Sequence, residues 1–595
     1  MSNLTVFSGF KNSQYVWNPK KNISLNQINF FKNIDIRGNN GGSMYVSNIR
    51  QSENDNYLYY NASTGQLTYS TGGITDYVIV EDNMSLLNAL IFNNGLLSVF
   101  SNSPFTIQID TQFVDFSSIT STSDTQFKLP LIETGTYNFI IDWGDGTKDL
   151  ITSYNQPSIT HTYPISAVYI INIIGTCIGW SFGSAGDCLK LTDIKNWGSG
   201  FNLGTVGGYF GGCSNMIISA TDTPNLTGTS SLFACFTNCS IMNSTSLSNW
   251  DVSNVTNLNS MFAECSDFNQ DLSSWDVSNV TTMLGLFTNS GFNNGDVIGD
   301  STRPLNGWNT SNVTSMSQTF GNCPFNQDIS GWDTSNVTDM FGMFFFNYFF
   351  NQDITGWNVS NVTNMSLMFS RARLFNQNLN SWNVSNVSNF SNMFAGSVSV
   401  NLTNLFNNGE TGFQSIPNII PANASYTNAT RTLTCTGATF TTTLVPGNVL
   451  IIQTPTIVYS SAIQSITNDT TLILVTAYGS NITIGTITSI QQQIPGTAPL
   501  NWDVSNATTL VNMFQYCIFF NQNIGNWNTQ KVTTVASLFQ GVASGITLFN
   551  NGQIITGTTS PMGVPTGWTF NSPPTNTNYR TNCRLTIANK PASLP

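Results

Sequence analysis

The sequence predicts a multidomain protein in which an α/β solenoid of short repeats is flanked and interrupted by all-β domains. A tryptophan-led unit recurs through the second half of the chain at a period of about 25 residues, within the range of repeat proteins. Segments before and within this array are rich in β-branched and aromatic residues separated by turn residues, which is typical of β domains. A chain of 595 residues also exceeds what one core usually supports. The repeat tryptophans are Trp250, Trp275, Trp308, Trp332, Trp357, Trp382, Trp502 and Trp527.

One repeat cannot bury its own apolar face, so successive copies are expected to stack as coils. The apolar residues of segment 255–262 lie at helical spacing and predict a short helix. Segment 272–277 predicts an extended stretch that pairs with the same stretch of the next coil. The tryptophan interval lengthens after Trp275 and after Trp382, which predicts a loop and an inserted module.

These patterns divide the chain into six predicted parts. They are a β-rich attachment region (1–124), a β-sandwich (125–176), repeats with an N-terminal cap (177–399), an inserted small β-barrel (400–497), resumed repeats (498–545) and a capping tail (546–595). In the first part, segment 57–69 predicts a hairpin around a Ser-Thr-Gly turn. In the second, Asp145-Gly146 supplies a tight turn between two apolar strands.

Composition restricts the partners. Only 8% of the residues are charged and the net charge is −12, so no basic surface for nucleic acid is expected. No apolar run reaches the ~18 residues of a membrane-spanning helix. The first residues, Met1 to Lys11, lack the basic and apolar regions of a secretory signal. Either a signal has been removed, or the protein reaches its destination without one.

Five cysteines occupy one position of the repeat, three residues after a phenylalanine, where other copies carry Ser, Asn or Ala. A position that accepts these side chains predicts a small buried site, and disulfides between coils, such as Cys239 with Cys265, are the alternative. These cysteines are Cys213, Cys239, Cys265, Cys323 and Cys517.

Stacking should place aspartates in rows along the solenoid. Asp271, Asp328 and Asp353 follow Asn-Gln, and another row follows the tryptophans. Such rows could bind Ca²⁺ or act as a glycosidase pair. Because several copies carry Asn at these positions, hydrogen-bonded turn capping is the favoured interpretation, and no metal or other cofactor is expected.

The tryptophan row has two interpretations, packing between coils and a stacking platform for sugars; its regular spacing favours packing. A second row is predicted to form an interior ladder in which each amide satisfies backbone groups at a bend of the coil. Its members are Asn269, Asn326, Asn351, Asn376 and Asn521.

The sequence contains only weak matches to catalytic motifs. Gly179-Trp-Ser-Phe-Gly183 matches the nucleophile elbow of hydrolases, but that fold needs a helix after the serine and a later histidine. The only histidine, His161, comes earlier and is assigned a structural role. We therefore predict a non-enzymatic protein.

The repeat Trp-Asp-Val-Ser-Asn-Val-Thr, Met-Phe and Phe-Asn-Gln-Asp-Leu resembles the BspA-like leucine-rich repeats of bacterial, protist and giant-virus surface proteins. Trp-Gly-Asp-Gly (143–146) and His-Thr-Tyr (161–163) resemble the PKD-type β-sandwich. The hairpin of 57–69 and the β-branched runs of the insertion resemble segments of virion proteins. These resemblances imply a leucine-rich-repeat-like surface or adhesion protein without enzymatic activity.

We expect an outer capsid or fibre component of a large DNA virus, located on the virion surface and mediating particle structure or host attachment. Its expected partners are other virion or surface proteins in a larger assembly, and a host glycan or receptor. A secreted bacterial adhesin is the alternative, and a polysaccharide-cleaving spike is the third hypothesis.

Overall fold

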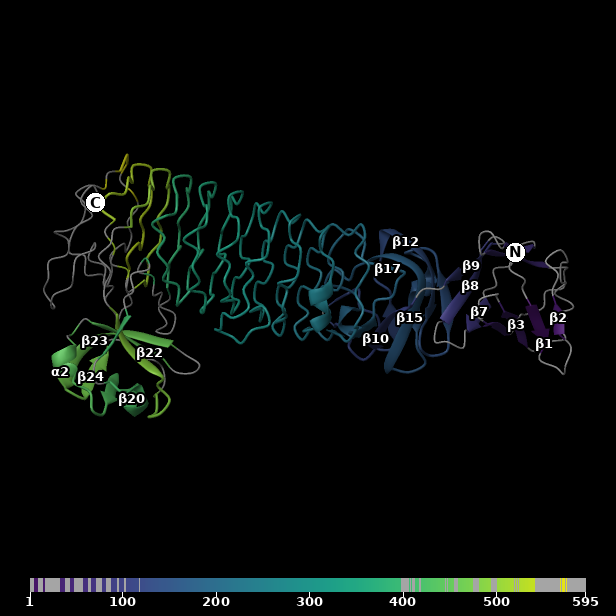
Figure 1. Ribbon diagram of the computed structural model, residues 1–595, viewed down its shortest axis with the longest axis horizontal. Coiled ribbons are helices and arrows are strands. Elements are labelled where there is room, and N and C mark those ends of the chain that lie inside the picture. The colour runs from purple at the N-terminus through teal and green to yellow at the C-terminus, as the bar shows by residue number, and fades with distance from the viewer. Residues whose placement is uncertain are drawn as a thin grey trace. The chain divides into compact units, whose positions relative to one another are not determined.

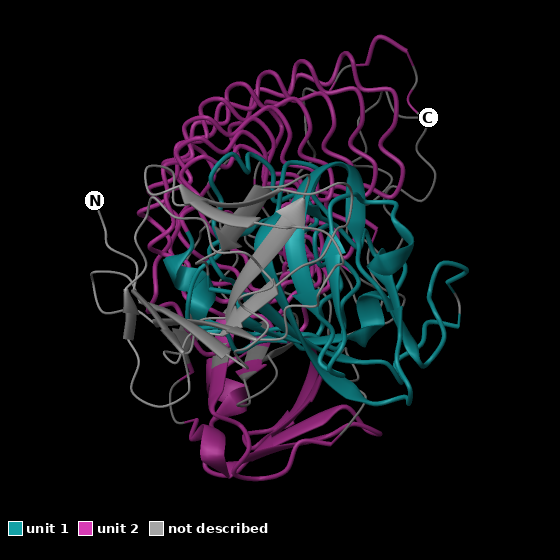
Figure 2. Ribbon diagram, turned by 90° about the vertical axis from the view of Figure 1, so that its right-hand side faces the viewer, with its two compact units in different colours: residues 1–250 teal, residues 251–595 magenta. Residues whose placement is uncertain are grey.

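The protein is mostly β-structure and is organised in several separate sheets. The computed structural model describes residues 103–396 apart from residue 117, most of 406–540, and a few residues around Trp568; of residues 1–102 it describes the strands by their backbone. The chain divides into two compact units, residues 1–250 and 251–595 (Figure 2).

The first strands of unit 1 form a nine-stranded sheet of order β2-β1-β3-β4-β7-β8-β9-β6-β5. The predicted hairpin at 57–69 is confirmed, because β5 and β6 pair antiparallel. The strands are β1 (Thr5–Ser8), β2 (Gln14–Val16), β3 (Asn33–Arg37), β4 (Ser43–Ser47), β5 (Tyr57–Asn61), β6 (Gln66–Ser70), β7 (Val78–Glu81), β8 (Leu87–Asn93) and β9 (Leu96–Phe100).

A second sheet of unit 1 has seven strands in the order β13-β12-β15-β10-β16-β18, with β17 beside β15. The predicted turn at Asp145-Gly146 is confirmed, since it joins the antiparallel strands β12 and β13. The strands are β10 (Phe105–Asp110), β12 (Leu131–Asp142), β13 (Lys148–Ile151), β15 (Val168–Trp180), β16 (Leu191–Asn196), β17 (Phe201–Asn202) and β18 (Ile217–Ile218). Strands β10 and β16 come from outside the predicted segment 125–176, so this sheet draws on both of its neighbours.

Beside this sheet, β11 (Gln126–Lys128) pairs antiparallel with β14 (Thr160–Thr162). Short 3-10 helices cover η1 (Pro157–Ile159), η2 (Cys188–Lys190) and η3 (Thr245–Asn249). Lys190 and Asp187 of the η2 turn form a fully buried ion pair at 3.1 Å. Asp187 accepts hydrogen bonds from the backbone N–H groups of Thr122 and Lys128, at 2.8 Å each. The pair therefore ties the segment before β12 to the η2 turn.

The repeats of unit 2 stack in register. Single parallel bridges connect equivalent residues of successive copies, and Figure 1 draws these copies as successive teal-to-green turns. The bridges run Asn257–Thr282–Ser315–Asp339–Asn364–Asn389–Thr509–Thr534. Two columns of stacked phenylalanine rings fill the interior, for example Phe262 on Phe287 with centroids 5.7 Å apart and Phe268 on Phe292 at 5.9 Å.

The predicted helix in each repeat is wrong. In segment 258–265 alternate backbone N–H groups point to the next coil: Ser260, Phe262 and Glu264 donate to carbonyls of residues 284, 286 and 288. The intervening N–H groups of Met261 and Ala263 donate three residues back. Ser260 and Glu264 also have positive φ, 53° and 61°, which an α-helix excludes.

The helical spacing of apolar residues therefore arises from a series of tight turns. The predicted pairing of coils through segment 272–277 is wrong as well, since the bridges lie near residue 257 and its equivalents. The α/β assignment of the repeats is accordingly corrected to a β-rich one, in which turns supply the inward-pointing residues.

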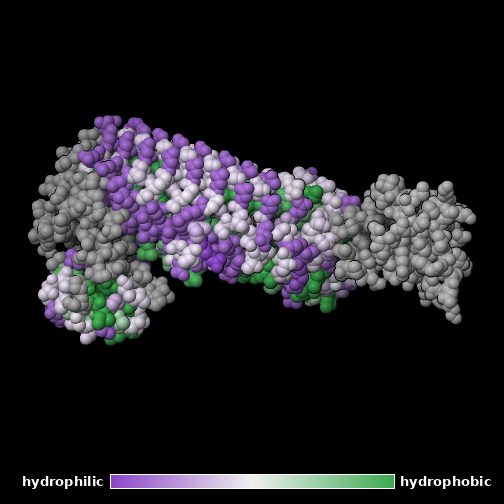
Figure 3. Space-filling view, viewed as in Figure 1, coloured by the Kyte–Doolittle hydropathy of each residue, from purple (hydrophilic) through white to green (hydrophobic). Residues whose placement is uncertain are grey.

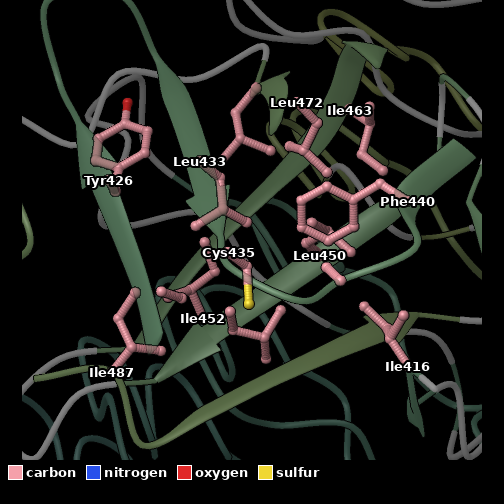
Figure 4. Packing of buried hydrophobic residues seen from close by; sticks show 14 of the residues in the cluster. Ile416, Tyr426, Leu433, Cys435, Phe440, Leu450, Ile452, Ile463, Leu472 and Ile487 are labelled. Atoms are coloured by element: carbon pink, nitrogen blue, oxygen red, sulfur yellow. The ribbon is translucent and has the colours of Figure 1, made fainter. Parts of the chain in front are cut away.

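The insertion forms a seven-stranded sheet of order β19-β25-β22-β23-β24-β21-β20. Its core contains Tyr426, Leu433, Phe440, Leu450 and Leu472, which Figure 4 shows converging between strands. The elements are β19 (Phe413–Ser415), η4 (Pro421–Asn423), β20 (Ala424–Thr427), β21 (Thr432–Cys435), α2 (Phe440–Thr443), β22 (Val449–Gln453), β23 (Val458–Asn468), β24 (Thr471–Leu474) and β25 (Ser489–Gln493). The described strands form an open order with β19 and β20 at its ends and do not close on themselves, so the predicted small β-barrel is corrected to a sheet.

Candidate interaction surfaces

The tryptophan row lies inside the stack. All eight predicted tryptophans are at most 3% exposed. The indole Nε1 of Trp308 donates to the carbonyl oxygen of Leu272 at 3.0 Å, and that of Trp332 donates to Leu305 at 3.0 Å. The same contact to the preceding coil is made by Trp357, Trp382, Trp502 and Trp527. Rings buried in this way have no face to offer to a sugar.

The tryptophan row continues beyond the predicted end of the repeats at residue 545. Trp568 stacks on Trp527, with centroids 6.3 Å apart, and donates from Nε1 to the carbonyl of Ile524 at 3.0 Å. The sequence carried a signal for this, because Gly567-Trp568 repeats the Gly-Trp pair found at Trp308, Trp332 and Trp357. Sequence reasoning missed it because a long segment separates the two tryptophans.

The predicted asparagine ladder joins adjacent coils at their edge. Asn326 Oδ1 accepts the N–H of Asn351 at 3.0 Å, and Asn351 Oδ1 accepts the N–H of Asn376 at 2.8 Å. Asn269 Oδ1 accepts the N–H of Asn293 at 2.8 Å. These residues are half-buried or exposed, so the ladder is not an interior one. Asn521 lies outside the described residues.

A further ladder, which the sequence analysis did not identify, uses the Asn and Thr of the Asn-Val-Thr element. Asn336 Nδ2 donates to the carbonyl of Ser311 at 2.8 Å, and Thr338 Oγ1 donates to that of Thr314 at 3.3 Å. Both side chains are exposed while the valine between them is buried. The visible face of the repeats in Figure 3 is accordingly mostly hydrophilic.

The candidate calcium ligands serve as turn caps. Asp353 Oδ1 accepts the N–H and hydroxyl of Thr355, at 2.9 and 2.7 Å. Asp271 Oδ1 does the same for Ser273, and its Oδ2 lies 3.4 Å from Arg303. Asp328 accepts from Ser330 and Asn306. Burial acts to raise the pKa of Asp328, but these hydrogen bonds outweigh it, so the pKa lies below its ordinary value. Within the described residues, no group of three or more His, Cys, Asp or Glu side chains could hold a metal ion.

The residues of the weak catalytic motifs are engaged in structural contacts. Ser181 Oγ donates to the carbonyl of Gly207 at 2.9 Å. His161 Nε2 lies 2.8 Å from Asp145 Oδ2, and its ring stacks on Trp143 at 4.7 Å. At the cysteine position of the repeat, Cys323 is buried, and this burial raises the pKa of its thiol to about 12.

Insertions leave the stack at one position of the coil. In regular copies the tryptophan follows the second phenylalanine by seven residues, as Trp332 follows Phe325. In the two long intervals, the phenylalanine is instead part of Phe-Asn-Asn-Gly, at 292–295 and 406–409. Both Phe292 and Phe406 stand in the second phenylalanine column, each stacked on an equivalent ring.

The second asparagine of Phe-Asn-Asn-Gly redirects the chain. Asn294 and Asn408 are buried, with φ of 54° and 55°, a conformation that asparagine tolerates better than most residues. Asn294 Oδ1 accepts the N–H of Leu272 at 2.8 Å, and Asn408 Oδ1 accepts that of Leu379 at 2.8 Å. The motif occurs a third time at 549–552, ahead of Trp568. Phe-Asn-Asn-Gly is therefore the sequence signal for the point at which an insertion leaves the stack. The tryptophan intervals alone did not locate this point.

The first insertion is a closed loop, residues 296–303, with an apolar tip. Asp296 accepts hydrogen bonds from the N–H and hydroxyl of Thr302 at 2.7 and 2.8 Å, and Gln327 Oε1 accepts the N–H of Arg303 at 2.8 Å. Val297 and Ile298 at its tip are 69% and 57% exposed.

An aromatic bend adjoins this tip. A Cβ on Gly299 would lie 3.5 Å from the ring of Phe349, which brings the loop next to segment 345–349. There, the Arg371 guanidinium lies over the Phe346 ring at 4.2 Å, and Phe346 makes an edge contact with Tyr348 at 6.2 Å. We call this surface the aromatic patch: Val297, Ile298, Phe346, Tyr348, Phe349 and Arg371.

The repeats are similar to one known protein family. Residues 206–303, 298–406 and 485–554 match the family described as "Mycoplasma protein of unknown function, DUF285". The chain is therefore similar to this family over most of its repeat region, and the match is compatible with a BspA-like repeat surface protein. No curated protein and no solved structure matches the chain significantly. In the described parts of the chain, no helix is long and apolar enough to cross a membrane.

Proposed function

We propose that the protein is a non-enzymatic structural and adhesive surface protein whose stacked repeats form a leucine-rich-repeat-like solenoid. The observation that carries this proposal is that the recurring residues of the repeat make contacts between coils. Tryptophan, phenylalanine and asparagine recur because they connect coils, as in the bond from Trp332 to Leu305 and the ladder from Asn326 to Asn351. Recognition is left to the non-repeating insertions, which emerge at the Phe-Asn-Asn-Gly corners.

The match to a repeat family supports a surface repeat protein. We further propose that it belongs to the outer capsid or fibre layer of a large DNA virus, where it shapes the particle surface or attaches it to a host. The hairpin of Tyr57–Asn61 and Gln66–Ser70 and the inserted sheet support this location, because their sequences resemble segments of virion proteins. The sandwich-like sheet around β12 and β15 would then act as a PKD-like spacer.

The location of the protein on purified virus particles tests this proposal. An antibody raised against the inserted sheet should label the surface of purified virus particles, and mild proteolysis of intact particles should release the protein. Labelling of bacterial cell surfaces instead would favour the secreted adhesin. Hydrolysis of a polysaccharide that is lost in Asp328→Ala, with folding retained, would favour the cleaving spike and contradict a non-enzymatic role.

A further inference from the structure

We propose that copies of this chain join head to tail, with the loop of residues 110–124 of one copy docked on the aromatic patch of the next. The partner in the larger assembly is thus a second copy of this chain, and the inference rests on the proposed function as a component of a surface assembly. It commits to a second copy because the chain itself carries two surfaces of complementary chemistry, an exposed loop and a patch whose aliphatic side chains are exposed and whose aromatic rings are half-buried.

The loop of residues 110–124, described except for residue 117, presents apolar side chains to solvent. Phe116 is 95% exposed, Ile119 is fully exposed, and Phe113 is 42% exposed. Large apolar side chains grouped in this way mark interaction sites on soluble proteins. Asp115 and Asp124 lie in this loop, Asp110 ends the strand before it, and the loop has no basic residue, so its apolar side chains lie among negative charges.

The ends of this loop are fixed. Thr111 N–H donates to the carbonyl of Ala167 at 3.1 Å, and Gly186 N–H donates to Thr120 Oγ1 at 3.0 Å. Thr122 Oγ1 donates to the buried Asp187 carboxylate at 2.7 Å. A loop whose ends are held loses little conformational entropy on binding, which favours its use as a docking element.

The aromatic patch contains one positively charged side chain, Arg371. Among the described residues Arg371 has no ion-pair partner, and its guanidinium instead covers the Phe346 ring. Burial raises the pKa of Tyr348, and the positive charges of Arg371 and Arg373 oppose this rise. Arg371 is the charged side chain of the patch, and its positive charge complements the aspartates of the loop in a chain with a net charge of −12.

The apolar parts of the two surfaces also match. Val297 and Ile298 offer aliphatic side chains beside the aromatic rings of the patch. A phenylalanine such as Phe116 could pack against these groups, and aromatic and arginine side chains are the usual centres of protein interfaces. A sugar ligand would leave Val297 and Ile298 uncovered, which favours a polypeptide partner. Because loop and patch differ, the contact is heterologous and can continue into an open chain of copies.

Two variants alter the loop and the patch one at a time without disturbing the fold. Phe116→Ser alters a side chain that lies in solvent. Arg371→Asn places asparagine at a position with φ of 60°, where the equivalent residues of two other copies are Asn289 and Asn322. Ile165→Ser, at another exposed apolar side chain, and Lys531→Asn, which removes a positive charge elsewhere on the repeats, are the matched controls.

Sedimentation velocity of the full chain at rising protein concentration tests the contact. Wild type and both controls should form progressively longer assemblies, and each variant should associate at least about tenfold more weakly. A mixture of Phe116→Ser with Arg371→Asn should stop at dimers, because one intact loop meets one intact patch. A wild type that stays monomeric, variants that assemble like wild type, or a mixture that forms no dimers would each overturn the proposal.

The head-to-tail contact and the proposed location on virus particles can be disproved independently of each other. If the protein labels virus particles but wild type stays monomeric, the proposed location stands and head-to-tail joining is wrong. If wild type is monomeric and an acidic oligosaccharide such as polygalacturonate binds in a manner lost in Arg371→Asn, the patch is a glycan site and the second copy is overturned as its occupant.

Discussion

The indole nitrogen of Trp357 donates a hydrogen bond to the carbonyl oxygen of Ile329 in the preceding coil, at 3.2 Å. The ring itself is buried and lies parallel to that of Trp382, with centroids 6.5 Å apart. One side chain thus bonds to the coil before it and packs on the coil after it. Repeat stability therefore depends on contacts between neighbours, as expected for stacked repeats.

Replacing this tryptophan should destabilise the stack. For Trp357→Ala we expect a loss of about 3 to 5 kcal/mol in the free energy of unfolding, because a large buried ring and its hydrogen bond are removed. Guanidinium denaturation of the full chain, followed by circular dichroism, measures this loss. Gly356→Ala is the control, since a Cβ there meets no atom within 4 Å. Equal stability of the two variants would contradict the role given to Trp357.

The left-handed backbone position of each coil should be sensitive to residue type. Leu367 has φ of 60°, and the equivalent residues of other copies include Gly342, Asn392 and Asn512. Because a side chain costs about 1 to 2 kcal/mol in this conformation and asparagine tolerates it best, Leu367→Gly or Leu367→Asn should raise the melting temperature. Leu367→Val should lower it. A higher melting temperature for the valine variant would show that packing of the side chain outweighs backbone strain.

Acid should weaken the repeats. Hydrogen bonds from the serine hydroxyls and N–H groups of Ser253, Ser278 and Ser335 hold the pKa values of Asp251, Asp276 and Asp333 below the ordinary value. Groups with a lowered folded pKa add stability that is present above their unfolded pKa of about 3.9 and is lost as pH falls through the folded pKa. The free energy of unfolding should therefore decrease as pH falls below about 4.

A variant tests this assignment. The triple change Asp251→Asn, Asp276→Asn and Asp333→Asn keeps an oxygen acceptor, as Asn309 and Asn358 do in other copies. Urea unfolding between neutral and acidic pH should show a shallower loss of stability for the variant than for wild type. Identical pH profiles would mean that other carboxylates control acid unfolding.

The buried ion pair of unit 1 should be intolerant of losing one partner. Lys190 Nζ donates to the carbonyls of Thr122, Ser123 and Gln126 in addition to pairing with Asp187. Lys190→Met leaves the Asp187 charge buried and should cost about 3 to 5 kcal/mol in the free energy of unfolding. It should also make segment 120–128 sensitive to limited proteolysis. Lys195→Met, which breaks the more exposed pair with Asp193, is the control and should have a small effect.

The sequence by itself determined the period of the repeats and the burial of their tryptophans. The tryptophan interval predicted stacking, because residues that recur at one position of a repeat meet in rows. The hairpin at 57–69 and the turn at Asp145-Gly146 followed from local turn chemistry, which depends on few neighbours. The Phe-Asn-Asn-Gly corners and Gly567-Trp568 were also present in the sequence, but their meaning appeared only when the columns were seen.

The tertiary structure alone decided how the backbone runs between these residues. Segment 258–265 has helical spacing, yet its alternate N–H groups bond to the next coil, a partner 24 or more residues away that local propensity does not include. The same applies to the insertion, where strand order depends on which edges pair. The aromatic patch likewise depends on the loop at Gly299 lying next to Phe349, residues far apart in the chain whose proximity is set by stacking.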